Sequence, residues 1–150
     1  MYSLKILLAL FIVALSTGIL RAQETKTING RIISEGLEPL PKAIIYSMDT
    51  TALGSTDTDG YFQIKVPVRT NDLLLGFIGM EWTSVKIKDD CQYLEMIMMT
   101  DVIYDFISIK KINRKRHKRL KLLPKMHQKA YEQGIFKSSN SCVCYVFKKY

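Results

Sequence analysis

The chain has 150 residues and a formal net charge of +8, so its length leaves room for one ordinary domain and not for several. The charge is uneven, because residues 23–100 carry a net −4 while residues 101–150 carry +10. Such asymmetry predicts a mildly acidic body followed by a strongly basic tail.

Residues 1–22 have the pattern of a secretory signal peptide. Lys5 precedes an apolar run over residues 6–15, and Ala22 supplies a small residue at the expected cleavage point, although Leu20 stands where a small residue is usual. The run is shorter than the roughly 20 apolar residues of a membrane span. We therefore expect export with cleavage after Ala22, and an uncleaved amphipathic anchor is the alternative.

Short β-type segments follow one another through the body of the chain. They are separated by turn signals roughly every 8–12 residues, which is typical of a sandwich or barrel, and no convincing crossover helix follows any of them. The segments cover residues 27–33, 43–48, 61–67, 73–78, 82–87 and 93–99. The pattern predicts an all-β sandwich of six or seven strands over residues 26–100.

Three local signals refine this prediction. Gly30 inside the first strand indicates a bulge or a close approach of backbone. Asp59 and Gly60, placed directly before an alternating run, predict a hairpin turn. Residues 73–78 are apolar on both faces, as in a central strand. The side chains that we expect to face the core are Ile32, Ile44, Phe62, Ile64, Leu74 and Val85.

The basic tail, residues 101–150, is expected to be partly helical. Residues 101–112 fit either a last strand or the start of a helix, and residues 143–147 are weakly β-like. Residues 125–133 predict a helix that ends at Gly134. This helix would begin near Pro124 and carry on one side Met126, Ala130 and Tyr131.

The chain has three cysteines, and export permits a disulfide. Cys142 and Cys144 are too close in sequence to pair easily. If a bond forms, Cys91 with one of these two is the better pairing; the alternative is that all three thiols stay reduced and packed.

Several spaced motifs agree in order with one known family. Residues 28–32 contain a Gly-Arg-Ile strand, residues 39–43 read Pro-Leu-Pro-Lys-Ala, and residues 56–62 read Thr-Asp-Thr-Asp-Gly-Tyr-Phe. Over about residues 26–100 the chain resembles the carboxypeptidase-regulatory-like domain family, with Lys42 in place of a usual Gly and Met80 in place of a usual aromatic residue.

The resemblance implies a transthyretin-like Greek-key β-sandwich of about seven strands without catalytic residues of its own. Such modules occur in exported Bacteroidetes-type proteins and at the N-terminus of TonB-dependent outer-membrane receptors. The expected location is therefore the periplasm or the periplasmic face of the outer membrane, or outside the cell.

The sequence offers little for catalysis or metal binding. An EF-hand aligned on Gly60 would need acidic residues where Ser55 and Val66 stand, so the acidic stretch indicates a turn. His117 and His127 lack the ligand spacing of a zinc site and are expected at the surface. The sequence has no P-loop, dinucleotide or nucleophile-elbow motif, so we predict no catalytic residue, cofactor or metal.

A dense basic cluster in the tail is the most unusual feature. Its cations are Arg114, Lys115, Arg116, Lys118, Arg119 and Lys121. Export argues against nucleic acid as their partner, which leaves an envelope protein or an anionic lipid surface. The alternative is a solvated helix that packs on the sandwich or docks on its acidic body.

The sequence therefore favours a non-catalytic interaction or scaffold module at the cell envelope. One alternative is an accessory component that docks on an outer-membrane transport receptor, by adding a strand to a sheet edge for instance. The other is an enzyme whose site has no recognised motif.

Overall fold

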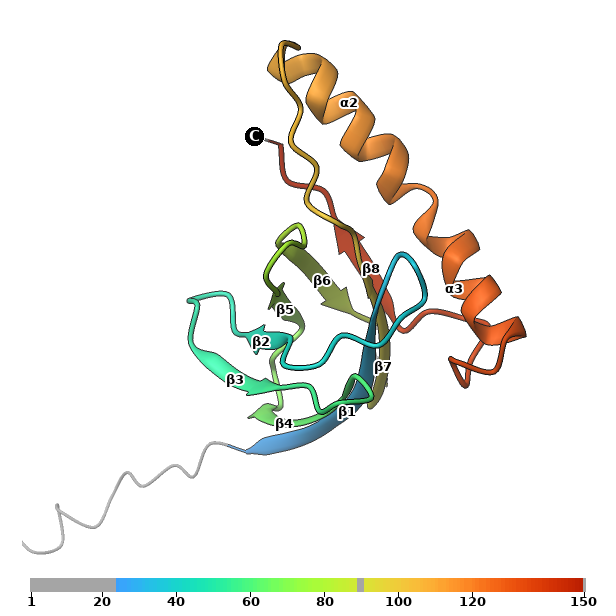
Figure 1. Ribbon diagram of the computed structural model, residues 1–150. Helices are drawn as coiled ribbons and strands as arrows, with labels where there is room; N and C mark the ends of the chain where they lie inside the picture. The colour runs from blue at the N-terminus through green and yellow to red at the C-terminus, as the bar shows by residue number, and fades with distance from the viewer. Residues whose placement is uncertain (1–23, 89–90, 150) are drawn as a thin grey trace, which may run out of the picture.

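The computed structural model describes residues 24–88 and 91–149, so the predicted signal peptide lies outside the described residues. Two β-sheets form a sandwich, and two helices extend along one side and beyond its end (Figure 1). The first sheet has the order β4 (Tyr61–Pro67), β1 (Thr25–Ser34), β7 (Tyr93–Met98). The second has the order β3 (Ala52–Ser55), β2 (Ile44–Tyr46), β5 (Asp72–Gly76), β6 (Thr83–Ile87), β8 (Val143–Val146). The predicted all-β sandwich with a helical tail is confirmed.

The sheet pairing contains one parallel contact. β1 pairs antiparallel with β4 but parallel with β7, whereas all pairs of the second sheet are antiparallel. β5 lies in the centre of the second sheet, as its apolar sequence predicts.

Alternation along the strands predicts the core where it is clean. Phe62, Ile64 and Val66 of β4 are buried and their neighbours are exposed, as expected. The prediction is wrong for Ile44 and Leu74, which are only half-buried. Ile45, Leu73 and Leu75 take the inward positions instead. Because β2 and β5 are apolar at successive positions, their sequences do not say which face is which.

Two glycines mark places where backbone needs room. A Cβ at Gly30 would lie 2.1 Å from the carbonyl oxygen of Leu94, so the predicted close approach is confirmed. Gly60 has φ +79°, and the Asp57 carboxylate accepts hydrogen bonds from the amides of Asp59 and Tyr61 at 3.0 and 2.8 Å. This turn is not a hairpin, however, because the two strands that flank it belong to different sheets.

The basic tail folds against the sandwich. After an irregular segment, α2 (Ile109–Leu120) and α3 (Leu123–Glu132) follow, and β8 then becomes an edge strand of the second sheet. Pro124 lies in the first turn of α3, and Gly134 with φ +70° follows its end, as predicted. Of the residues expected on one side of this helix, Ala130 is buried and Tyr131 is exposed.

A second apolar cluster joins α3 to the first sheet. Its buried members are Ile33, Ile97, Met99, Leu123, Ala130 and Phe136. Tyr145 of β8 packs against both this cluster and the main core, and its hydroxyl accepts a hydrogen bond from the amide of Ile97 at 2.7 Å. Burial raises the pKa of the Tyr145 phenol above its ordinary value.

A disulfide fastens the tail to the body. Cys91, just before β7, is bonded to Cys142 at the start of β8, with a Cα–Cα distance of 5.8 Å, while Cys144 is free and exposed. The expected pairing of Cys91 with one of the two tail cysteines is thereby confirmed.

Candidate anionic-surface binding site

Two carboxylates of the sandwich set the orientation of α2. Glu81, between β5 and β6, is buried and accepts hydrogen bonds from Arg116 Nε at 3.2 Å and from Arg119 Nη1 at 3.1 Å. Glu35, which follows β1, accepts one from Arg119 Nη2 at 2.9 Å. These ion pairs turn one side of the helix toward the acidic body.

Arg119 stays fully cationic in this setting. Burial alone would lower its pKa, but a hydrogen bond with Tyr104 and the charges of Glu35 and Glu81 outweigh burial, and the pKa of Arg119 is raised. Its guanidinium also donates to the carbonyl oxygen of Thr100 at 2.8 Å. Arg119 therefore fastens α2 to three separate segments of the body, at Glu35, Glu81 and Thr100.

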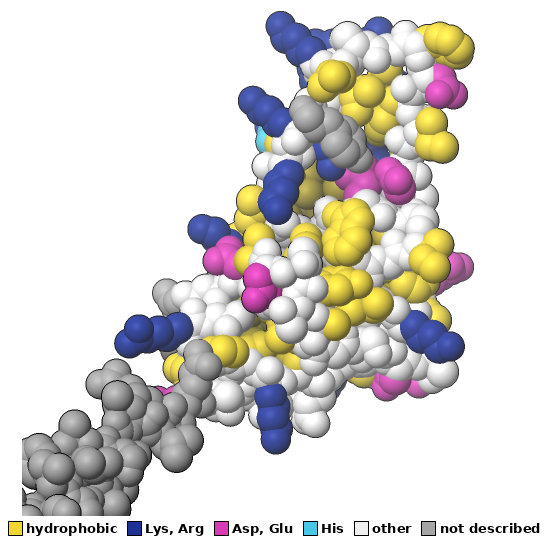
Figure 2. All heavy atoms as spheres, turned by 90° about the vertical axis from the view of Figure 1, so that its left-hand side faces the viewer, with side chains coloured by type: hydrophobic (Ala, Val, Ile, Leu, Met, Phe, Trp, Pro, Cys, Tyr) yellow, Lys and Arg dark blue, Asp and Glu magenta, His cyan; other side chains and the backbone are white. Residues whose placement is uncertain are grey.

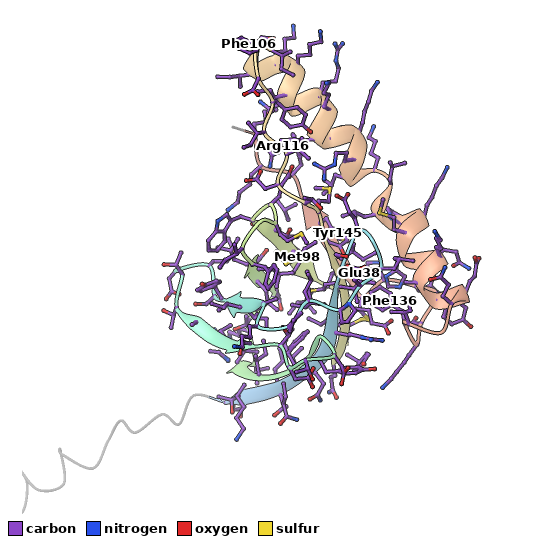
Figure 3. The ribbon with its side chains drawn as sticks, in the orientation of Figure 1. Glu38, Met98, Phe106, Arg116, Phe136 and Tyr145 are labelled. Atoms are coloured by element: carbon purple, nitrogen blue, oxygen red, sulfur yellow. A yellow bond between two sulfur atoms is a disulfide. The ribbon has the colours of Figure 1, made fainter. Side chains whose placement is uncertain are left out.

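The C-terminal segment runs beside the same helix. Arg116 Nη1 donates to the carbonyl oxygen of Lys148 at 2.9 Å, and its guanidinium lies 5.6 Å from the centre of the Phe147 ring. His117 meets that ring edge-on at 5.0 Å. Figure 3 labels Arg116 where the helix passes the C-terminal segment. Two of the six predicted anion-contacting residues, Arg116 and Arg119, thus point inward and bind the protein itself.

The other four predicted residues, Arg114, Lys115, Lys118 and Lys121, are exposed. Two further exposed cations, Lys110 and Lys111, lie on the same outward side. We call these six residues the basic face: Lys110, Lys111, Arg114, Lys115, Lys118 and Lys121. The sequence prediction missed Lys110 and Lys111, although the spacing of Lys110, Arg114 and Lys118 at every fourth residue signals one helix side.

The helix that carries the basic face has no acidic residue of its own. No acidic residue occurs between Phe106 and Tyr131 in the sequence, and the first turn of α2 has cations where a helix favours anions. Lys115 contacts the ring of Tyr104 at 5.5 Å. The surface can therefore attract a negatively charged partner without internal competition from carboxylates on the helix.

A hollow of about 530 Å³ opens between α2 and the C-terminal segment. Ile109 and Phe147 supply its apolar lining, and Lys110, Arg114 and Lys149 supply positive charge. A second groove, of about 660 Å³, lies on the sandwich. Its lining includes Tyr46 and Trp82, whose rings are in contact with centres 5.4 Å apart. The first hollow borders the basic face through Lys110 and Arg114. A further hollow, of about 420 Å³, borders it through Lys121.

The histidines do not form a metal site in the described part of the chain. His117 is exposed as expected, but the expectation is wrong for His127, which is buried against Phe136 with Nε2 2.9 Å from the carbonyl oxygen of Ser138. Among residues 24–88 and 91–149, no three His, Cys, Asp or Glu side chains gather as a metal would require. Within the same residues, neither helix has the length and apolar character needed to cross a membrane.

Comparison with known proteins identifies the sandwich. A search of curated proteins finds no match. The model of the CarboxypepD_reg-like domain family matches residues 28–103, from within β1 to just beyond β7. Domains of this family are non-catalytic regulatory folds. Because the match spans half of the chain, the protein belongs to the CarboxypepD_reg-like domain family.

Proposed function

We propose that this protein is a non-catalytic, exported interaction module of the cell envelope whose basic face binds an anionic surface. The observation that carries the proposal is the position of six exposed cations on the outward side of α2, while the two inward arginines hold the helix to the body. The sandwich then serves as the scaffold that presents the helix.

The energetics of α2 support a role in binding rather than in stability. Lys110, Arg114 and Lys118 are neighbours at four-residue spacing, and each such like-charge pair destabilises a helix by about 0.2–0.5 kcal/mol. Lys110 and Lys111 also oppose the positive end of the helix dipole. An anionic surface would relieve both penalties, because it places negative charge beside these side chains.

Export is supported by two features. Residues 1–22 have the signal-peptide pattern. The Cys91–Cys142 bond suits an oxidising compartment such as the periplasm, since cytosolic thiols are kept reduced.

The proposal is tested with envelope membranes and lipid vesicles. The variant replaces Lys110, Lys111, Arg114 and Lys118 by Gln. The matched control replaces four exposed cations of the sandwich, Lys42, Lys65, Arg69 and Lys86, by Gln, so that the net charge falls equally. Co-sedimentation is measured on isolated envelopes, on envelopes treated with protease, and on phosphatidylglycerol and phosphatidylcholine vesicles.

We expect the wild type and the control to bind envelopes at low salt, and the helix variant to bind at least 100-fold more weakly, since each cation near an anionic surface contributes about 1 kcal/mol. If the protein still binds envelopes that have been treated with protease, the anionic surface is lipid. If protease treatment abolishes binding, the surface is an envelope protein. Equal binding by helix variant and wild type would refute the role of the basic face.

A further inference from the structure

The end of the α2 projection carries exposed apolar side chains. Phe106 is fully exposed, Ile103 is 85% exposed and Ile109 is 62% exposed. We call Ile103, Phe106 and Ile109 the apolar tip; the exposed Asp105 lies directly before Phe106 in the sequence. Figure 3 labels Phe106 at the end of the projection, far from the sandwich. In Figure 2, hydrophobic, basic and acidic side chains occur together at this end of the molecule. Exposed apolar groups gathered in this way mark interaction sites.

The backbone at Phe106 has a strained conformation, and the side chain of this residue is exposed. This residue has φ +57°, the left-handed region that a bulky side chain rarely adopts. Because the ring is fully exposed, no packing inside the protein offsets the strain. Strained positions of this kind occur at active sites, ligand clamps and switch regions; Leu37, Lys42 and Thr50 also have positive φ, and Phe106 differs from Leu37 in that its side chain is fully exposed.

The hollow between α2 and Phe147 lies at the same end. Its lining combines Ile109 and Phe147 with the cations Lys110, Arg114 and Lys149. An apolar lining with positive charges suits a molecule that has both a hydrocarbon part and a phosphate. The amino end of α2 adds partial positive charge there.

We infer that the anionic surface is a phospholipid bilayer and that α2 docks on it with its amino end first. The apolar tip enters the interface, the flanking lysines meet headgroup phosphates, and the hollow receives one lipid headgroup. This inference rests on the proposed function and names its partner.

Two features favour a bilayer over a folded protein partner. The tip projects beyond the sandwich, so a flat surface reaches it without obstruction (Figure 1). Its side chains stand out individually beside many cations, which matches a fluid apolar layer under an anionic surface; a protein partner would need a matching set of pockets.

The insertion test uses tryptophan fluorescence. Trp82, the single tryptophan, is replaced by Phe, and Phe106→Trp then places a reporter at the tip. The matched control carries Val68→Trp, at an exposed position after β4. With phosphatidylglycerol vesicles we expect the emission of the tip reporter to shift to shorter wavelength and to be quenched by lipids brominated in their acyl chains. The control reporter should show neither effect.

A second variant needs no reporter. Phe106→Ser removes an exposed ring and should leave the fold intact, while affinity for anionic vesicles falls about tenfold and its salt dependence is unchanged. Charge-dependent vesicle binding without a shift or quenching at position 106 would overturn tip insertion and leave the proposed function standing. The protein could instead bind envelopes only before protease treatment and bind no vesicles. This result would also overturn the inference that the partner is a bilayer. Absence of charge-dependent binding to any of these surfaces would instead refute the proposed function.

Discussion

Among single residues, Glu81 is the buried carboxylate that contacts two arginines of α2. Its carboxylate is buried and meets both Arg116 and Arg119, so it selects which side of α2 faces the body. The sequence indicates the basic cluster but not which of its cations face the body, because arginine and lysine occupy both the inward and the outward positions. The deciding partner lies 35 residues away along the chain from Arg116, beyond the reach of any local pattern.

Glu81→Gln should destabilise the protein. The substitution leaves two guanidinium groups without their shared buried counter-charge, and we expect the free energy of unfolding to fall by about 3 kcal/mol. Urea unfolding followed by circular dichroism measures the change. The control, Glu38→Gln at an exposed position, should alter stability by less than about 0.5 kcal/mol. Equal effects of the two substitutions would show that the ion pairs do not hold the helix.

Burial of Tyr145 should make the folded protein less stable at alkaline pH. Its pKa is raised by burial, so the folded protein keeps the phenol neutral where the unfolded chain, with a pKa of about 10, ionises. The unfolded state therefore binds fewer protons, and stability falls as pH rises above about 10. Comparing urea unfolding of the wild type and Tyr145→Phe from neutral to alkaline pH tests this. The wild type should lose stability more steeply above that pH, and parallel curves would contradict it.

At the scale of elements, the sequence predicted most where one periodic pattern dominates. β4 alternates cleanly and α3 has a proline at its start and a glycine after its end, so both were located well. β2 and β5 are apolar at successive positions, so their sequences do not determine which side chains face the core. The turn at Asp57–Gly60 was recognised, but its flanking strands diverge to different sheets, and sheet membership depends on long-range pairing that no short window contains.

The disulfide should contribute strongly to the attachment of β8. Cys91 and Cys142 are 51 residues apart in sequence, and closing a loop of this length stabilises by about 4 kcal/mol in the chain-entropy model. Cys142→Ser should therefore lower the unfolding free energy by an amount of this order, measured by urea unfolding without reductant. Cys144→Ser is the matched control and should leave stability unchanged, because that thiol is free and exposed. Equal stability of both variants would exclude the predicted bond.

For the whole molecule, the charge asymmetry between body and tail was readable from the sequence, and so was the family of the sandwich. The sequence indicated weak β character at residues 143–147, where β8 lies. It did not predict that this strand joins the second sheet or that the tail supplies a second apolar cluster, because both depend on contacts with β6, β1 and β7. The apolar tip was also missed, since residues 101–112 fit a strand or a helix equally well and only the structure exposes Phe106.

The proposed export makes a prediction for the whole chain. In cells fractionated into cytosol, periplasm and membranes, the mature protein should occur in the envelope fractions and should begin at Gln23, because cleavage is expected after Ala22. Sequencing of the purified amino terminus decides this. A cytosolic protein that begins at Met1 or Tyr2 would contradict the proposed location in the cell envelope.

The most direct test of the central claim is the salt dependence of binding to anionic vesicles. The dissociation constant of the wild type for phosphatidylglycerol vesicles is measured by co-sedimentation over a range of sodium chloride concentrations, beside the four-cation helix variant. Attraction between the basic face and the surface predicts a steep loss of wild-type affinity as salt rises, and a shallow dependence for the variant. An affinity that is insensitive to salt, or equal for phosphatidylcholine vesicles, would contradict the claim.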